Sequence, residues 1–342
     1  MRKKRGRLEM ARYLLYGALT FGAMCLCVCV GSVGIPLGET LAVIWNALTG
    51  RPQPEGLAVS IILSVRLPRV LCVALSGTAL SLAGAAMQGL LKNPLADGST
   101  LGVSSGASLG AVLAIAFGIS FPGVPFAGTM VMAILFAFLS LVVILGLSYQ
   151  LDRGLSTNTI ILIGVIYSMF VSSAMSVIIA FASDKVKDIT FWTLGSLQAS
   201  SYQKALILGG ALAVCGGVLL SRARELNAFA VGEDNARHIG VDIRATKLVI
   251  LITVSVLIGV CVSIGGTISF VGLVTPHMVR MLAGPDHRRL LPATAFGGAV
   301  FLLLADLAAR TLVAPIELPI GVVTSLVGAV VFIVIFYKAG KG

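Results

Sequence analysis

Hydrophobic residues in this chain run in long, nearly uninterrupted windows separated by short polar stretches. A bilayer core about 30 Å thick takes about 20 apolar residues of helix, and the windows are close to that length or above it. The pattern therefore predicts ten transmembrane helices, near residues 12–32, 58–80, 92–118, 124–149, 158–181, 203–221, 244–266, 268–284, 290–313 and 317–337.

Transmembrane strands do not fit this pattern. The strands of a membrane barrel are segments of about ten residues with alternating hydrophobicity, and these windows are longer and continuous. Composition agrees with helices in a membrane: 57% of the 342 residues are hydrophobic and 11% are charged, against about 25% charged in soluble domains. We expect an all-α polytopic membrane protein formed by a single transmembrane domain, residues 1–342.

The N-terminal apolar run could be a signal peptide or a first transmembrane helix. At roughly 20 residues it is longer than a typical signal-peptide core, and no A-x-A cleavage site follows it. No small residue directly precedes Cys25, so a lipoprotein-type cleavage is also disfavoured. We interpret the run as an uncleaved first span.

Basic residues are distributed unevenly between the two sides of the membrane. With the N-terminus inside and ten spans, most of the 25 Lys and Arg residues lie inside; the exceptions are Arg51, Arg66, Arg69, Lys185, Lys187, Lys204 and Arg310. The positive-inside rule then places both termini in the cytoplasm. The net charge of +11 is thus an orientation signal, and we expect no nucleic-acid partner.

All six cysteines lie in apolar windows, three of them at Cys25, Cys27 and Cys29. Positions two apart on a helix point away from each other, so these three side chains cannot surround one ion. We expect small packed side chains and no metal site.

Special residues recur at a spacing of 182 positions. Under this shift Gly77, Ser81, Gly84, Leu91, Pro94 and Gly102 fall on Gly259, Ser263, Gly266, Leu273, Pro276 and Gly284. The second span then corresponds to the seventh, and because five spans intervene, the two copies cross in opposite directions. This predicts an inverted repeat of spans 2–5 and 7–10, as in many transporters. The chain divides into residues 1–57, the first repeat 58–181, a connecting segment 182–243, and the second repeat 244–342.

A helix break is predicted at Asn93-Pro94, since proline lacks an amide proton and disfavours helix before it. Gln88 and Asn93 can satisfy backbone groups freed by the break. A run of glycine and serine follows from Gly102 to Gly110. Small residues allow close helix packing and can also line a polar route, and the sequence leaves both roles open.

The longest polar segment on the inside is residues 222–243. It is longer than a simple connection between two helices needs. A short helix suits residues 234–238, with Gly240 as its C-cap. The segment is either an ordinary loop or a short interfacial helix pair that binds a cytoplasmic partner.

Few ionisable residues lie within the spans. Asp306 and Arg310 are one helical turn apart, so we expect them to pair, which lowers the cost of both in a membrane. His277 lies beside Pro276 without a second or third metal ligand nearby, and a hydrogen-bonded structural role is favoured over a ligand or proton relay. Arg280 is expected to reach the interface or a backbone carbonyl.

These motifs resemble the FecCD/BtuC family, the permease subunits of ABC importers for ferric siderophores, haem and cobalamin. The segments that carry the resemblance, in the family's order, are RLPR at 66–69, NPLA at 93–96, WTLGSL at 192–197, LNAFAVGEDNARHIGV at 226–241, GTISFVGLVTPHMVR at 266–280 and ELPIGVVTSLVGAVVF at 317–332. The resemblance covers nearly the whole chain after residue 35.

The resemblance implies a ten-helix subunit in the bacterial cytoplasmic membrane, paired with an identical or closely related permease. It further implies two cytoplasmic ATPase subunits and an extracytoplasmic substrate-binding protein. We expect no cofactor on the chain itself; ATP and Mg²⁺ belong to the ATPase, since the sequence has no G-x-x-x-x-G-K-S/T motif.

The resemblance also implies roles for individual residues. Arg66, Arg69 and Arg310 match basic positions that meet the binding protein. The ATPase-coupling positions are Leu226, Phe229, Gly232, Glu233, Ala236, Arg237, Ile239 and Gly240. The pathway and gate positions are Gln88, Asn93, Leu101, Ser104, Ser105, Ser156 and Thr157.

Two other classes of function are disfavoured. A secondary transporter driven by protons or sodium needs ion sites at the membrane midplane, and the spans hold almost no carboxylates besides Asp306. A membrane enzyme needs a cluster of acids, histidines or metal ligands, and the three histidines are scattered. The leading hypothesis is an ATP-driven permease for a ferric siderophore, with haem and cobalamin as alternative cargoes.

Overall fold

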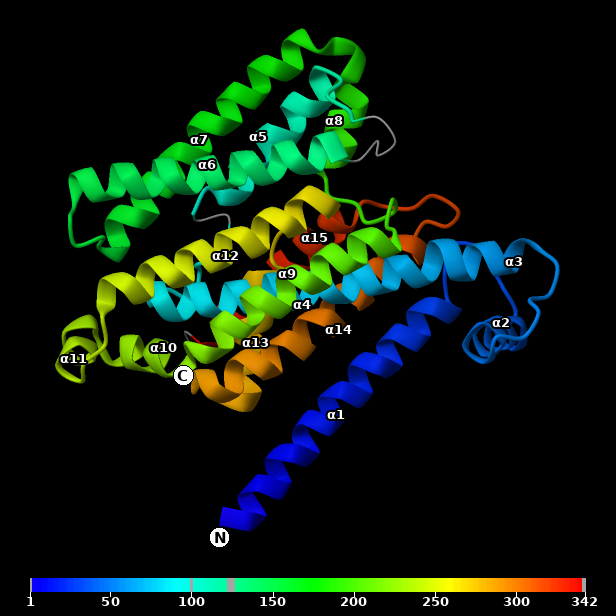
Figure 1. Cartoon of the computed structure of the whole chain (residues 1–342), viewed down its shortest axis with the longest axis horizontal. Coiled ribbons are helices and arrows are strands. Elements are labelled where there is room, and N and C mark those ends of the chain that lie inside the picture. The colour runs from blue at the N-terminus through cyan, green and yellow to red at the C-terminus, as the bar shows by residue number, and fades with distance from the viewer. Residues whose placement is uncertain (1, 99–100, 122–126, 340–342) are drawn as a thin grey trace.

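The computed structural model describes residues 2–98, 101–121 and 127–339, and its elements are helices (Figure 1). Seven helical stretches in this part of the chain are long and apolar enough to cross a membrane. They are α1 (Arg2–Cys29), the continuous α3 (Leu57–Ser60), η1 (Ile61–Arg66) and α4 (Leu67–Leu91), and then α6 (Ala127–Leu151), α7 (Thr157–Phe181), α9 (Tyr202–Ser221), α12 (Ile243–Gly265) and α14 (His287–Thr311).

Three further helices occupy the remaining predicted spans: α5 (Val103–Ala116), α13 (Val271–Ala283) and α15 (Ile320–Ala339). The order of the ten predicted spans is thereby confirmed. The sequence analysis did not predict α2 (Leu37–Thr49), η2 (Ser183–Lys185) or α8 (Val186–Thr193). In Figure 1, α2 and α3 lie at one end of the molecule, and α10 (Ala223–Val231) and α11 (Glu233–His238) lie at the opposite end.

The predicted inverted repeat appears in the packing of the helices. Helix α4 packs against α14, and its counterpart α12 packs in the same way against α6. Helix α5 contacts α6 and α7, as α13 contacts α14 and α15. Figure 1 shows α4 running from α3 toward the end that holds α11, whereas α12 runs from α11 in the opposite direction.

The residue-by-residue shift of 182 positions is wrong, although the pairing of helices is right. Pro94 lies in the break after α4, whereas Pro276 lies inside α13. Gly102 precedes the first residue of α5, whereas Gly284 follows the last residue of α13. The link between the first two helices of the repeat is longer in the first copy, and an ungapped shift cannot follow it.

The predicted break at Asn93-Pro94 is confirmed, but the third span begins later than predicted. Helix α4 ends at Lys92 in a left-handed conformation (φ 49°), and the side-chain oxygen of Asn93 accepts a hydrogen bond from the amide of Leu95 at 2.9 Å. Helix α5 begins only at Val103, after Gly102 with φ 71°. Residues 92–98, 101 and 102 thus lie outside the helices, although Leu95, Ala96 and Leu101 make the stretch look apolar.

Glycines let α4 approach its neighbours closely. A Cβ atom built on Gly84 would collide with the backbone of Gly272 in α13. One built on Gly77 would collide with the backbone of Gly298 and come within 2.9 Å of Leu302 Cβ in α14. Backbone atoms cannot rotate away as a side chain can, so these contacts require glycine.

Replacing Gly84 by alanine is therefore expected to destabilise the protein, by roughly 1–3 kcal/mol or more, because the helices must separate. Thermal unfolding of the purified protein in detergent measures the effect. Gly217→Ala in α9 is the matched control, since no atom lies within 4 Å of its Cβ position. Equal melting temperatures for the two variants would contradict the close contact between α4 and α13.

Candidate functional site

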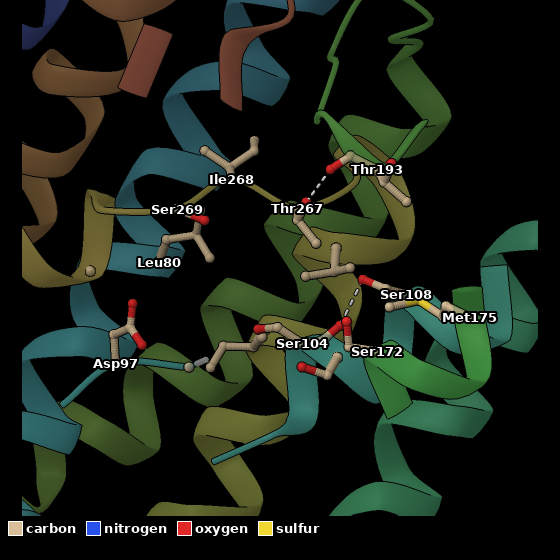
Figure 2. Close-up of a pocket in the computed structure, with 15 residues that line it drawn as sticks. Leu80, Asp97, Ser104, Ser108, Ser172, Met175, Thr193, Thr267, Ile268 and Ser269 are labelled. Carbon is tan, nitrogen blue, oxygen red and sulfur yellow. Dashed lines mark hydrogen bonds between the residues drawn. The ribbon is translucent and has the colours of Figure 1, made fainter. Parts of the chain in front are cut away.

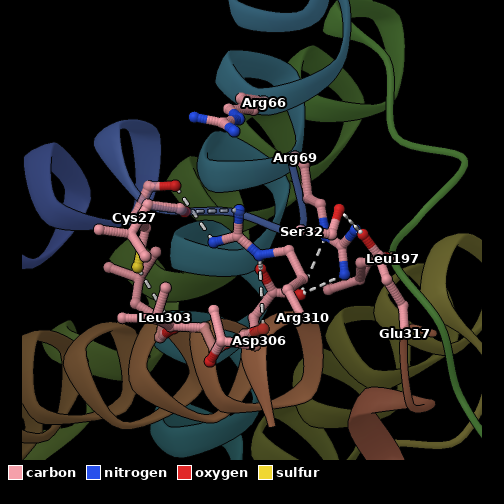
Figure 3. Close-up of polar contacts among 12 residues, drawn as sticks. Cys27, Ser32, Arg66, Arg69, Leu197, Leu303, Asp306, Arg310 and Glu317 are labelled. Atoms are coloured by element: carbon pink, nitrogen blue, oxygen red, sulfur yellow. Dashed lines mark hydrogen bonds and ion pairs between the residues drawn. The ribbon is translucent and has the colours of Figure 1, made fainter. Parts of the chain in front are cut away.

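A buried ion cluster lies where the first turn of α4 meets the last turns of α14 (Figure 3). Arg69 Nη2 lies 2.9 Å from Asp306 Oδ1, and Arg69 Nη1 lies 2.6 Å from Glu317 Oε2. Arg310 Nε lies 2.9 Å from Asp306 Oδ2, so the predicted pair one helical turn apart is confirmed. One carboxylate thus joins two guanidinium groups, and Arg69 joins α14 to the segment before α15.

Two of the arginines donate hydrogen bonds to backbone carbonyls at the C-terminal end of α1. Arg66 Nη1 donates to the carbonyl oxygens of Val28 and Cys29, at 2.9 and 3.1 Å. Arg310 donates to the carbonyls of Cys27 and Val30, both at 3.2 Å. The last carbonyls of a helix have no partner within it and carry partial negative charge, so these guanidinium groups stabilise the end of α1.

The three arginines of the predicted docking surface are buried in this structure. The exposed fractions of Arg66, Arg69 and Arg310 are 4%, 5% and 2%, and each makes the contacts described above. In this conformation the three arginines bind α1 and the two carboxylates, and their contact with a binding protein stays a prediction.

Glu317 extends the cluster toward the surface. Its carboxylate accepts from Ser32 Oγ at 2.9 Å and from Gln198 Nε2 at 3.0 Å, besides the ion pair with Arg69. Partial burial raises the pKa of this carboxyl, but the hydrogen bond and charge of Arg69 outweigh it, and the net pKa is lowered. Glu317 therefore stays ionised and holds the links before α2 and α9 against α4.

A cavity of about 320 Å³ lies between the two repeats (Figure 2). Helices α5, α7 and α12 contribute to its wall, together with the segment between α12 and α13. The wall is rich in hydroxyl groups, from Ser104, Ser105, Ser108, Ser172, Thr193, Thr267 and Ser269. Among its described lining residues Asp97 is the only ionisable one.

The predicted pathway residues divide between two cavities. Ser104 and Ser105 line the first, whereas Leu101 is 1% exposed and packs in the core. Gln88 and Asn93 lie together in a second cavity of about 240 Å³. Ala230 of α10 also lines this second cavity, so it lies at the end of the molecule that holds the short helices.

Gln88 replaces a hydrogen bond that α13 cannot make. Pro276 has no amide proton, so the carbonyl of Gly272, four residues earlier, lacks its helical partner. Gln88 Nε2 donates to this oxygen at 3.3 Å and to Leu273 O at 3.1 Å. Arg280 Nη2 donates to Gln88 Oε1 at 3.1 Å, a side-chain partner in place of the predicted interface or backbone carbonyl.

The segment 222–243 forms a pair of short helices, α10 and α11, which meet at Gly232 (φ 135°). Leu226, Phe229 and Ala236 are at most 1% exposed and fix the pair to the membrane helices. Val231 and Ile239 are 73% and 72% exposed, and Arg237 and Gly240 are also exposed. The predicted coupling positions thus divide into an anchoring side and a free side.

Helix α10 is tied to the start of α14. Asn227 Nδ2 donates to Asp286 Oδ1 at 2.6 Å, and Asn227 Oδ1 accepts the backbone amide of His287 at 2.8 Å. The hydrogen bond from Asn227 lowers the pKa of Asp286, which keeps the carboxylate ionised. This contact joins the helix pair to the second repeat.

The predicted gate residues lie where the loop 152–156 meets α7: Ser156 is the N-cap residue and Thr157 is the first residue of the helix. Asp152 closes this loop by accepting the amides of Gly154 and Ser156 at 2.8 and 2.9 Å. Hydrogen bonds from Ser156 and Gly154 lower the pKa of Asp152. Ser156 Oγ lies 2.9 Å from Thr159 Oγ1, so the loop and the first turn of α7 form one rigid unit.

Three residues in these contacts were absent from the predicted sites: Asn227, Lys247 and Glu317. Lys247 Nζ lies 2.8 Å from Glu233 Oε2. A lysine near the start of an apolar span could have indicated an ion pair from the sequence alone, because charged groups there are costly unless paired. Glu317 and Asn227 gave no comparable signal, since their partners lie 248 and 59 positions away in the chain.

An all-helical membrane fold with an inverted repeat and a central polar cavity defines the chain as a membrane transport protein. A model of the FecCD transport family matches residues 19–338. The chain therefore belongs to the FecCD family and is an ABC transporter permease, a transport component.

Individual relatives agree with this assignment. A Bacillus subtilis (strain 168) protein named as the uncharacterized ABC transporter permease YvrB is 41% identical over 334 residues, 97% of this chain and 95% of that protein. The hemin transport system permease HmuU of Yersinia pestis is 36% identical over 300 residues, 87% of each chain. A solved structure of a proposed metal-chelate type ABC transporter, in an inward-facing conformation, matches with a TM-score of 0.83 at 32% identity, covering 96% of this chain and 99% of that one.

Proposed function

We propose that this permease imports a ferric siderophore, driven by ATP hydrolysis on separate subunits. In this proposal two permease subunits, identical or closely related, enclose the pathway. Two cytoplasmic ATPase subunits bind below them, and an extracytoplasmic binding protein delivers the cargo. The observation that carries the proposal is the α10–α11 pair: α10 packs against α4 of the first repeat and α14 of the second, and the exposed side of the pair offers Val231 and Ile239 to a partner.

We place α10 and α11 in the cytoplasm, with both termini on the same side. The positive-inside distribution of Lys and Arg supports this orientation. In Figure 1 the start of α1 lies in the half of the molecule nearer to α10 and α11.

The cavity supports a neutral or cationic chelate as cargo. Its described wall combines hydroxyl groups with the carboxylate of Asp97. A second permease subunit of the same sequence would bring a second carboxylate to the pathway. Such a wall hydrogen-bonds the polar surface of a ferric trihydroxamate and repels a polyanion. Haem and cobalamin remain the alternative cargoes, and the relative from Yersinia pestis is named for hemin.

Competition for uptake tests the cargo. Proteoliposomes are prepared with the permease, its ATPase and its binding protein. Radioactive ferric trihydroxamate is added to the outer solution, with an excess of unlabelled haem or cobalamin. We expect neither competitor to lower the uptake of iron. Iron uptake that falls when haem or cobalamin is added would contradict the siderophore proposal while leaving ATP-driven import intact.

The ATPase surface can be tested separately. Val231→Asp places a charge on the exposed side of α10 and should lower retention of the ATPase subunit in co-purification, because interface cores disfavour unpaired charge. Val186→Asp in α8, at the other end of the molecule, is the control. Equal retention by both variants would count against a partner at α10–α11.

A further inference from the structure

A buried ammonium group joins the helix pair to the loop that precedes α7. Lys247 projects from the first turns of α12, and its side chain is 1% exposed. Its Nζ donates to Glu233 Oε2 in α11 at 2.8 Å and to the backbone carbonyl of Leu155 at 2.9 Å. One side chain therefore contacts α11 and the loop 152–156, two segments far apart in the sequence.

Simple stabilisation is a poor account of this lysine. A buried charge is stripped of water, and apolar residues of similar volume often stabilise a protein at least as well as a buried ion pair. What an apolar side chain cannot do is bind a carboxylate and a carbonyl at once. The contact thus gives the structure a specific connection, beyond filling space.

Hydrogen bonds within the loop 152–156 link its residues to one another. Leu155 adopts a left-handed conformation (φ 51°), which turns the chain between α6 and α7. Asp152 bonds the amides on both sides of Leu155, at Gly154 and Ser156. A displacement of the Leu155 carbonyl would therefore carry Ser156 and the start of α7 with it.

Helix α12 itself is braced against α6 next to the lysine. Arg244 lies over the ring of Tyr149, with 4.8 Å between Cζ and the ring centroid, an arrangement that stabilises a cation at an aromatic face. Asp242 caps the helix by accepting the amide of Ala245 at 2.9 Å. Lys247 is thus held on a fixed support, and Glu233, with a side chain 31% exposed, is its contact nearest to solvent.

We propose that Lys247 is a positioning residue that transmits movement of the helix pair α10–α11 to the loop 152–156 and so to the start of α7. The inference rests on the proposed function, in which an ATPase moves the helix pair. It adds the route by which that movement reaches the predicted gate residues Ser156 and Thr157.

Two readouts test this role in the full complex of permease, ATPase and binding protein. The first is the number of ferric trihydroxamate molecules imported per ATP hydrolysed. We expect Lys247→Met to lower this ratio roughly five- to tenfold, within the range of typical coupling energies, while ATP hydrolysis continues. Glu233→Gln should lower the ratio less, because the amide can still accept a hydrogen bond from the lysine.

The matched control is Lys204→Met in α9. Lys204 is also buried, at 8% exposure, and its ammonium donates to the carbonyl of Ala199 at 2.6 Å, but at the opposite end of α9 from the helix pair. Lys204→Met should leave the ratio of import to hydrolysis unchanged. Lys247→Arg should give a ratio between those of Lys247→Met and the wild type. A wild-type ratio in Lys247→Met would overturn the inference.

The second readout does not depend on the cargo. Spin labels at exposed positions 153 and 234, in a background without the six native cysteines, report the distance between the loop and α11. We expect one narrow distance distribution in the wild type, with and without bound nucleotide, and a broad or nucleotide-dependent distribution in Lys247→Met. A narrow distribution in that variant contradicts the inference, even if the wild type imports nothing and the proposed function has failed.

Discussion

Replacing Asp306 by alanine is expected to cost about 3–5 kcal/mol, the usual effect of removing one partner from a buried ion pair. The carboxylate is fully buried and contacts both Arg69 and Arg310. Without it, Arg310 keeps backbone carbonyls and Arg69 keeps Glu317, but two buried positive charges lose the group between them. We expect the ends of α1, α4 and α14 to separate. The resulting loss of stability is measured as a lower melting temperature in detergent.

Two further variants test whether the loss of stability comes from the missing charge of Asp306. Asp306→Asn keeps the shape and a hydrogen-bond acceptor while removing the charge, so its melting temperature should lie between those of the wild type and Asp306→Ala. Asp188→Ala removes an exposed carboxylate from α8 and should have almost no effect, as for most surface positions. If Asp306→Ala has the same melting temperature as the wild type, the cluster does not hold the ends of α1, α4 and α14 together.

Replacing Ser105 by tryptophan is expected to reduce cargo uptake to about a tenth or less, because the indole would fill the cavity between the repeats and narrow the route. Ser105 is partly exposed to this cavity of about 320 Å³. The helix pair and the loop 152–156 are untouched by the change, so ATP hydrolysis by the complex should continue. Radioactive uptake and phosphate release, measured on the same proteoliposomes, separate the two effects.

Ser105→Ala serves as the control for this variant. It removes one of several hydroxyl groups in the wall and leaves the space open, so its uptake should stay near the wild-type rate. Normal uptake by Ser105→Trp would show that the cargo takes another route through the molecule.

Hydrophobic pattern was enough to predict which segments cross the membrane, because each span must be apolar over nearly its full length. It was not enough to place the start of α5. Leu95, Ala96 and Leu101 keep the hydropathy high through a connection whose shape is set by Pro94, Lys92 and Gly102. Where a helix resumes after such a break depends on packing, which the pattern does not contain.

The three arginines illustrate the same limit at the candidate site. Their position near helix ends and the pairing of Arg310 with Asp306 follow from local spacing. The side-chain direction does not: Arg66 turns toward the end of α1, and Arg69 turns toward Glu317, 248 positions later. A basic residue near a membrane surface can face solvent or bind the ends of its neighbours, and only the packed structure distinguishes the two.

The short helices in residues 222–243 were predicted more accurately than the side-chain directions of the arginines. A long polar stretch with apolar residues at helical spacing must pack those residues against the rest of the protein. Leu226, Phe229 and Ala236 are the buried ones. The sequence analysis did not separate them from the exposed Val231 and Ile239, nor did it associate Lys247 with Glu233. These distinctions depend on how α11 lies against α12.

ATP dependence of uptake tests the central claim most directly. The permease is reconstituted with its ATPase and binding protein, with ATP and Mg²⁺ on the ATPase side, and import of a radioactive ferric siderophore is followed. The account predicts uptake that requires hydrolysable ATP, stops when a non-hydrolysable analogue replaces it, and is unaffected by ionophores that collapse proton and sodium gradients. Uptake that continues without hydrolysis, or that ends when the gradients are collapsed, would contradict an ATP-driven importer.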